Sequence, residues 1–283
     1  MTQLTPYISG FEVKPSRITN TGEVFFTNGS IEVSPNQRQC EAYGYTYDAS
    51  TGTCRAFTNS QKLSGTFTRE DNVIKGQGNS VLGGSKNTFI MGVNNVINGD
   101  SQNNIIIGNH NEITSGVNNT FVYGTLASST VDNSIVLGGN APTDILGERQ
   151  VTTLMCGRQT TDGTTVNSFI NNVTDNLYTL ARNAVIYFQA DILSVRIGGD
   201  SGSGAVGDFK SWVERGVFVN KSGTMSISRS RTSPASSGTT TGWSPVSTVS
   251  GQNYVLTVTG AADMTIEWVA SLRFTQITTS VSL

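Results

Sequence analysis

The sequence predicts an all-β protein built around a parallel β-roll. Residues 71–140 hold a series of short units that each pass through two or three strand-forming residues and close on glycine, for example NTFIMG and NNIIIG. Gly76, Gly92, Gly108 and Gly124 follow one another at intervals of 16 residues. A short strand and a tight turn use about eight residues, so this interval makes one coil of two strands. Self-similarity at a fixed short period is typical of a solenoid.

The residue types of the repeat favour the same fold. Glycine adopts positive φ at a turn without steric cost, and asparagine tolerates it better than most residues. Asparagine also forms side-chain ladders when it recurs at the same place in successive coils. A low-complexity polar linker is the alternative, but linkers lack periodic apolar triplets. The repeat therefore indicates a roll.

Apolar triplets within the repeat predict that the roll associates with copies of itself. Some triplets are apolar throughout, such as Ile105-Ile106-Ile107, whereas Val96-Ile97-Asn98 alternates. A fully apolar strand is covered on both faces and an alternating strand on one. A roll of about five coils that rises only ~5 Å per coil is too thin to cover such strands alone. We expect three copies about a fibre axis, with a trimer core of Phe89, Met91, Ile105, Ile106, Ile107, Phe121, Tyr123 and Ile135.

Composition excludes several classes of function. The chain has 283 residues, of which 36% are hydrophobic and 13% charged, and its length allows two or three domains. The net charge of −2 gives no electrostatic footprint for nucleic acid. No apolar run approaches the ~18 residues of a membrane span, so no membrane insertion is expected. The first residues lack the basic and apolar regions of a signal peptide, which predicts synthesis in a cytosol.

The chain divides into four expected segments. They are an N-terminal β-hairpin domain at 1–70, the roll at 71–140, a connector at 141–150, and a C-terminal antiparallel β-sandwich of jelly-roll type at 151–283. In the first segment, Asn28-Gly29 between two strand-forming runs predicts a hairpin with a two-residue turn. In the last, long alternating strands such as Ala184–Arg196 and Thr265–Phe274 are separated by turn signals.

Cysteine and histidine usage predicts neither a metal site nor a cofactor. Zinc needs four ligands, or three and a water, and the single histidine, His110, has no cysteine near it in sequence. Cys40 and Cys54 either close a disulfide across a hairpin in an oxidising medium or remain two buried thiols.

Two Ser/Thr/Gly-rich stretches, Gly198–Gly207 and Ser230–Gly242, are long enough to be functional loops. Arg229, Arg231 and Trp243 bracket the second and are the candidate ligand-binding residues. Arginine offers a planar fork to anionic glycan groups, and tryptophan offers a stacking face. The alternative is that Trp243 packs into the sandwich while both arginines are solvated.

The same residues give little support for catalysis. Glycan hydrolysis needs two carboxylates held ~5 to 9.5 Å apart. The roll offers only Asp71, Asp100, Glu112 and Asp132, and Asp100 and Glu112 are out of register with the 16-residue coil. We therefore expect no catalytic residues and a protein that is not an enzyme.

Several C-terminal motifs resemble a domain found at the ends of tailed-bacteriophage fibre and appendage proteins. The matching pieces are NLYTL at 176–180, YFQADI at 187–192, YVLTVTG at 254–260 and MTIEWVASL at 264–272. The usual basic stretch after the second strand is reduced to Arg215, which leaves the loop geometry open. The roll separately resembles the trimeric β-rolls of autotransporter adhesins, although its coils are Asn-rich and two residues longer.

These resemblances imply a homotrimeric appendage located in a virion. Other virion proteins are the expected partners of the N-terminal region, and a host surface glycan is the expected partner of the far end. A capsid decoration or head fibre without host binding is the main alternative. A glycan-degrading tailspike is the less favoured one.

Overall fold

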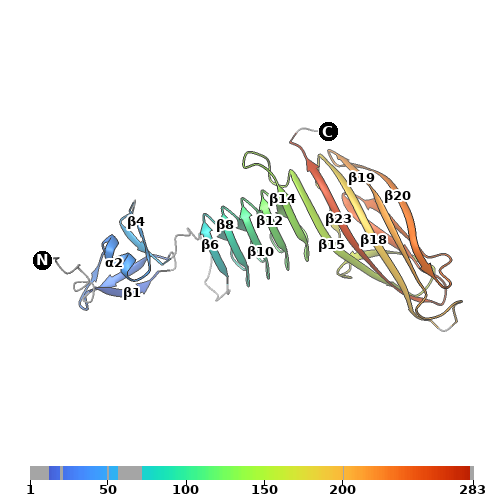
Figure 1. Cartoon of the computed structure of the whole chain (residues 1–283), viewed down its shortest axis with the longest axis horizontal. Coiled ribbons are helices and arrows are strands. Elements are labelled where there is room, and N and C mark those ends of the chain that lie inside the picture. The colour runs from blue at the N-terminus through green and yellow to red at the C-terminus, as the bar shows by residue number, and fades with distance from the viewer. Residues whose placement is uncertain (1–12, 20–21, 50, 57–71, 200, 281–283) are drawn as a thin grey trace.

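The computed structural model of the chain describes residues 13–19, 22–49, 51–56, 72–199 and 201–280. Its described elements are strands apart from one short helix, and the roll is a parallel solenoid, so the predicted all-β fold is confirmed. An N-terminal region, the roll and a C-terminal domain follow one another along the chain (Figure 1). No helix within the described residues is long and apolar enough to cross a membrane.

The N-terminal region begins with a three-stranded sheet of β1 (Lys14–Ile18), β2 (Val24–Thr27) and β3 (Glu32–Val33). The β2–β3 turn is longer than the predicted two-residue turn, because Thr27 pairs with Glu32 and leaves four residues between them. Asn28 explains the difference. Its side-chain oxygen accepts hydrogen bonds from the N–H groups of Ser30 and Ile31, each at 3.0 Å, which closes a wider turn.

A disulfide cross-links the helix and the second strand pair of the N-terminal region. Cys40 lies on α2 (Gln37–Ala42) and bonds Cys54 on β5 (Thr53–Arg55), which pairs with β4 (Thr46–Asp48). The bond therefore links a helix to a strand rather than two strands of one hairpin. The two cysteines make up half of a four-residue buried core, with Val24 and Phe26. So small a core depends on its cross-link. Tyr43 and Tyr45 pack edge-on against Phe26.

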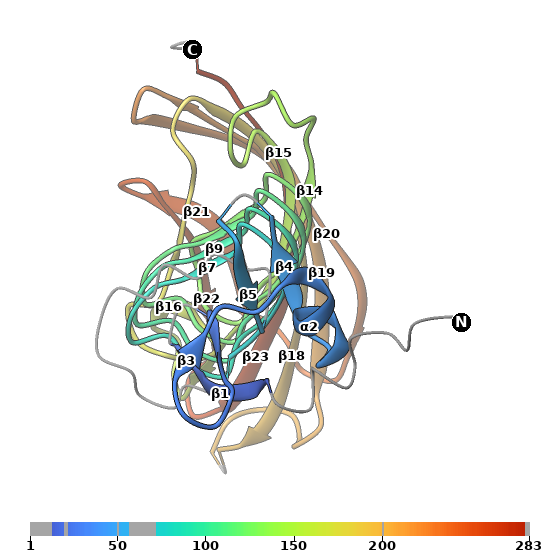
Figure 2. The same ribbon diagram turned by 90° about the vertical axis from the view of Figure 1, so that its left-hand side faces the viewer.

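The roll consists of two parallel sheets. The long-strand sheet contains β6 (Val73–Gln77), β8 (Phe89–Val93), β10 (Ile105–Asn109), β12 (Phe121–Thr125) and β14 (Ile135–Gly139). The short-strand sheet contains β7 (Ser80–Val81), β9 (Val96–Ile97), β11 (Glu112–Ile113) and β13 (Ser128–Ser129). Figure 2 shows the coils nearly end-on. Ile105 pairs with Phe89 and with Phe121, which confirms the 16-residue coil, and the last coil is two residues shorter because Phe121 pairs with Ile135.

Stacked identical positions explain why this sequence forms a roll. Asn79, Asn95 and Asn111 form a buried ladder, in which Asn95 Nδ2 donates to Asn79 Oδ1 at 2.9 Å and to the Gly108 carbonyl at 2.7 Å. A Cβ added to Gly92 would lie 1.7 Å from the Gly108 carbonyl oxygen, so only glycine fits there. The close stacking of successive coils therefore requires Asn and Gly at these positions of the repeat.

The C-terminal domain continues the long-strand sheet. β14 pairs antiparallel with β15 (Arg149–Thr160), and the sheet then runs through β23 (Thr265–Thr278), β18 (Ala184–Gly198), β19 (Phe209–Lys221) and β20 (Thr224–Ser237). A smaller layer contains β16 (Thr165–Ile170), β17 (Tyr178–Thr179), β21 (Ser244–Ser250) and β22 (Asn253–Thr259). Aromatic side chains fill the core, among them Phe188, Phe218, Trp268 and Phe274. Roll and domain thus share one sheet.

Candidate functional site

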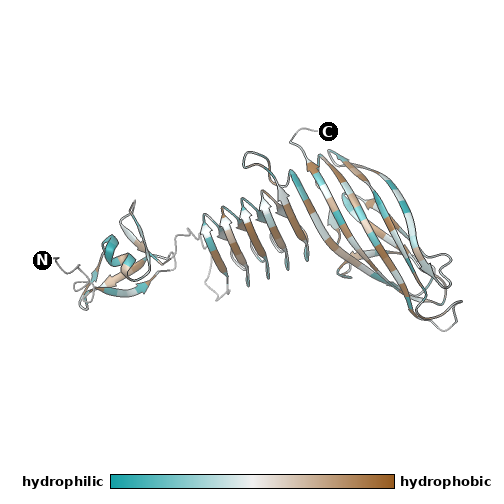
Figure 3. Cartoon of the chain, viewed as in Figure 1, coloured by the Kyte–Doolittle hydropathy of each residue, from teal (hydrophilic) through white to brown (hydrophobic). Residues whose placement is uncertain are grey.

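One face of the long-strand sheet is apolar and exposed, and we call it the apolar face. Successive side chains of each strand alternate, so Ile90, Ile106 and Val122 lie inside the roll at 0% exposure. Their neighbours point outward, and Tyr123 is 54% exposed. Brown, hydrophobic segments recur along the strands of the roll in Figure 3, which colours inward and outward residues alike. Lys75 is the one charged residue that these five strands carry.

The side of the sheet that carries the apolar face continues onto the C-terminal domain. Leu137 of β14 pairs with Val151 of β15 and Ile135 with Thr153, so these residues share one side of the sheet. Most exposed large hydrophobic side chains of the described residues lie on this side. They are Val73, Met91, Val93, Ile105, Tyr123, Ile135 and Leu137 on the roll, and Met155, Val185, Tyr187, Leu193, Ile197, Val269 and Ile277 on the domain.

The outer face of the short-strand sheet is polar by contrast. Asn98, Thr114 and Glu112 lie on it, and Asn98 Nδ2 donates to Glu112 Oε1 at 2.7 Å. Neighbouring coils thus bond to one another through side chains on this face.

The structure separates the predicted trimer-core residues into two groups. Phe89, Met91, Ile105, Ile107, Phe121, Tyr123 and Ile135 all occupy outward positions of the long-strand sheet. Ile106 does not, because it is the middle residue of its triplet and points into the roll at 0% exposure. Its assignment to a trimer core is corrected, since it belongs to the core of one chain.

A shallow groove of about 320 Å³ runs across three coils at the border of the apolar face. On one side Asn103 Nδ2 donates to Asn119 Oδ1 at 3.0 Å, and both residues have left-handed φ angles near 55°. On the other side lie Ile105, Phe121 and Ile135. Amide groups beside apolar and aromatic side chains suit a ligand with hydroxyl groups and apolar faces.

Of the three predicted ligand-binding residues, Arg229 and Arg231 are exposed and Trp243 is buried. The stretch Ser230–Gly242 is a strand as far as Ser237, so it is not the predicted loop. Arg229 Nε lies 3.3 Å from the carboxylate of Glu214, which is 1% exposed, and Arg231 Nη1 donates to Ser244 Oγ at 3.3 Å. Trp243 is 3% exposed and lies against Trp268. Arg231 therefore bonds across to the smaller layer, whereas Arg229 pairs with a residue of the neighbouring strand in its own sheet.

Four loops gather at one end of the C-terminal domain, and their described residues are 161–164, 199 with 201–208, 238–243 and 260–264. Arg196, which is 3% exposed, orders the second by donating to the carbonyl oxygens of Gly198, Gly199 and Ser203. Asp208 accepts hydrogen bonds from the N–H groups of Ala205 and Thr239, which lower the pKa of its carboxyl. The described residues of the second loop are thus held by a buried arginine and an aspartate.

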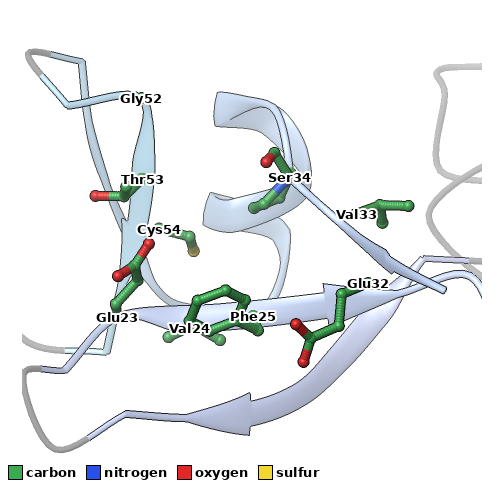
Figure 4. A pocket seen from close by; sticks show the side chains of 10 residues that line it. Glu23, Val24, Phe25, Glu32, Val33, Ser34, Gly52, Thr53 and Cys54 are labelled. Carbon is green, nitrogen blue, oxygen red and sulfur yellow. The ribbon is translucent and has the colours of Figure 1, made fainter.

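Figure 4 shows a second groove, of about 160 Å³, in the N-terminal region. Glu23 and Glu32 lie on either side of Phe25. Arg17 bonds Glu32 at 2.7 Å and lies 4.1 Å from the centre of the Phe25 ring. This hydrogen bond lowers the pKa of Glu32.

The remaining candidate side chains have local partners. His110 shares a 3.1 Å hydrogen bond with Asn94, and Asp132 accepts from the N–H of Asn118. Asp71 lies outside the described residues. Burial raises the pKa of the Cys156 thiol to about 11, which keeps it protonated. Within the part of the chain that the structure describes, no three His, Cys, Asp or Glu side chains are placed to hold a metal ion.

Comparison with solved structures finds phage tailspike proteins. The tailspike of Acinetobacter baumannii phage AM24 matches at 9% identity with a TM-score of 0.26, over 74% of this chain and 50% of that one. The tailspike of Acinetobacter phage vB_ApiP_P1 matches at 12% identity and 0.25, over 74% and 49%. The tailspike of A. baumannii bacteriophage Fri1, a capsular polysaccharide depolymerase, matches at 9% and 0.24, over 77% and 46%. The chain spans about half the length of these proteins.

No protein-family model matches the chain, and no curated protein does. The similarity to tailspikes corrects one expectation. A protein without enzymatic activity was predicted from the scarcity of paired carboxylates, and that prediction is contradicted, because the Fri1 protein is a capsular polysaccharide depolymerase.

Proposed function

We propose that the chain is a subunit of a homotrimeric, fibre-like appendage of a tailed-bacteriophage virion. The observation that carries the proposal is the apolar face, which is exposed on one side of the long-strand sheet and continues over the C-terminal domain. Burying one Leu- or Ile-sized side chain stabilises by ~1.5–3 kcal/mol, and monomeric proteins rarely leave so long an apolar surface in water. Copies of the chain would bury it against one another.

The order of the parts along the chain supports a role for each. The N-terminal region has a compact core and a groove with two carboxylates, which suits attachment to other virion proteins. The roll serves as the shaft. The four-loop end of the C-terminal domain lies far from the N-terminal region (Figure 1), where a host surface would be met.

The groove at the border of the apolar face is not assigned to a host glycan, because Ile105, Phe121 and Ile135 line it and also belong to the apolar face that copies of the chain would bury against one another.

The native mass of the purified chain tests the assembly. Three times the 30.1 kDa of one chain is the expected mass by light scattering. A stable 30.1 kDa species at micromolar concentration would overturn the trimer. A gold label at the C-terminus then places the protein on virions. Label at the outer end of tail appendages is expected, and label on the capsid would contradict the host-contact role.

A further inference from the structure

A polar row interrupts the apolar face in the middle of the C-terminal domain. Strand registers place Thr153, Arg273, Gln189 and Arg215 side by side on β15, β23, β18 and β19. Asp191 occupies the next outward position on β18. Apolar side chains surround these residues, among them Met155, Tyr187, Leu193 and Val269, each at least 38% exposed.

The charges in this row are incompletely paired within one chain. Gln189 Nε2 donates to both carboxylate oxygens of Asp191, at 3.1 and 2.9 Å. Within the described residues, neither Arg215 nor Arg273 has a carboxylate at ion-pair distance. The row therefore offers two cationic side chains and one carboxylate on one outward surface.

The roll part of the apolar face cannot fix how copies align along the fibre. Apart from Lys75 in the first coil, its outward rows repeat with the same apolar character, so a shift by one coil, about 4.8 Å, keeps most apolar side chains in contact. The polar row occurs once, on strands that have no counterpart in the roll. In other repetitive assemblies a single polar position fixes register in this way.

We infer that this row sets the axial register of the assembled appendage, with Asp191 of one copy pairing with Arg215 and Arg273 of a neighbouring copy. The inference rests on the proposed self-association. Copies aligned at equal height bring β18 strands together, and the two arginines lie on the strands directly beside β18, each about 4.8 Å away. The row carries both signs of charge, so a second copy satisfies it, whereas a uniformly anionic partner would leave Asp191 opposed by like charge.

The residue types fit a protein interface as well. Tyr, Met and Arg are enriched at interfaces and Lys is depleted. Tyr187, Met155, Arg215 and Arg273 occupy this part of the face.

A charge reversal tests the inference in the full-length chain. Asp191→Arg alone should raise the concentration at which the assembly dissociates by about tenfold or more, because like charges then meet, and added salt should reduce the effect. The triple change Asp191→Arg, Arg215→Asp and Arg273→Asp should restore association towards the wild-type value. Ser250→Arg, which adds a charge to an exposed position of the smaller layer, is the matched control.

A cysteine cross-link measures the axial register between copies separately from their affinity. Ser271→Cys places a thiol beside Asp191, and copies in register should form a cross-linked dimer band under mild oxidation. That band should weaken in the Asp191→Arg background and return in the triple variant. An associating wild-type protein in which Asp191→Arg changes neither dissociation nor cross-linking would overturn the inference and leave the proposed function standing. A monomeric wild-type protein would overturn both.

Discussion

The two outer faces of the roll arise from the same coils but have opposite character. Ile105 and Tyr123 are exposed on the long-strand sheet, whereas the short-strand sheet presents Asn98, Glu112 and Thr114. Both sheets bury the same kind of residue inside, such as Ile106 and Ile113 at 0% exposure. Only the outward positions differ.

This difference separates two requirements that the sequence must meet. Interior isoleucines, stacked asparagines and close-packed glycines make one coil bind the next, and both sheets share them. The outward apolar side chains add nothing to that stacking and are exposed in one chain. Folding of the roll and association of copies should therefore respond to different substitutions.

The largest expected effect is at the interior. Ile106→Asp should unfold the roll, because it buries a carboxylate with no partner, and even Ile106→Ala should cost about 2–5 kcal/mol. Ile105→Asp, one residue away and 40% exposed, should leave the strands formed and weaken association. Circular dichroism and thermal melts distinguish the two. Similar melting of both variants would break the distinction between interior and apolar face.

A smaller effect is expected where coils touch through glycine. A Cβ at Gly108 would lie 1.9 Å from the Gly124 carbonyl oxygen at φ +135°, so Gly108→Ala should destabilise the roll by more than about 2 kcal/mol. Gly116 has φ +76° with no atom within 4 Å of an added Cβ, so Gly116→Ala should cost about 1 kcal/mol from backbone strain alone. Denaturant unfolding measures both, and equal losses would argue against close coil packing.

The asparagine ladder should contribute less per residue. Asn111→Ala removes hydrogen bonds to Asn95 and to the Gly124 carbonyl, which should cost about 1–3 kcal/mol. Asn109→Ala, at an exposed position, should change stability by less than about 0.5 kcal/mol. Ala127 already occupies the next ladder position in the chain, which shows where the ladder ends. If the unfolding curves of the two variants coincide, the asparagine ladder does not stabilise the roll.

Much of the roll could be predicted because each coil repeats the same pattern of glycine, asparagine and apolar residues. The glycine interval gave the coil length, and the strand registers reproduce it. The placement of Ile106 could not be predicted from an apolar triplet alone. Three successive apolar residues do not reveal which one points inward, and that depends on the pairing of the coil.

The candidate site was harder to predict in the C-terminal domain. Ser230–Gly242 is rich in residues typical of loops, but pairing with β19 makes most of it a strand, and Arg229 and Arg231 then face the smaller layer. The helix α2 was missed because it has only six residues. Its one signal was the capping box formed by Asn36 and Gln39. The polar row with Asp191 depends on registers between strands distant in sequence, which no local pattern reveals.

The most direct test of the central claim compares one substitution on each face of the roll. Tyr123→Asp and Thr114→Asp add the same charge to exposed positions of the apolar and polar faces. Sedimentation velocity then measures the mass of each variant. Tyr123→Asp is expected to sediment as a folded monomer, while Thr114→Asp is expected to keep the mass of the wild-type assembly. Association that survives Tyr123→Asp, or that both substitutions weaken equally, would contradict the central claim.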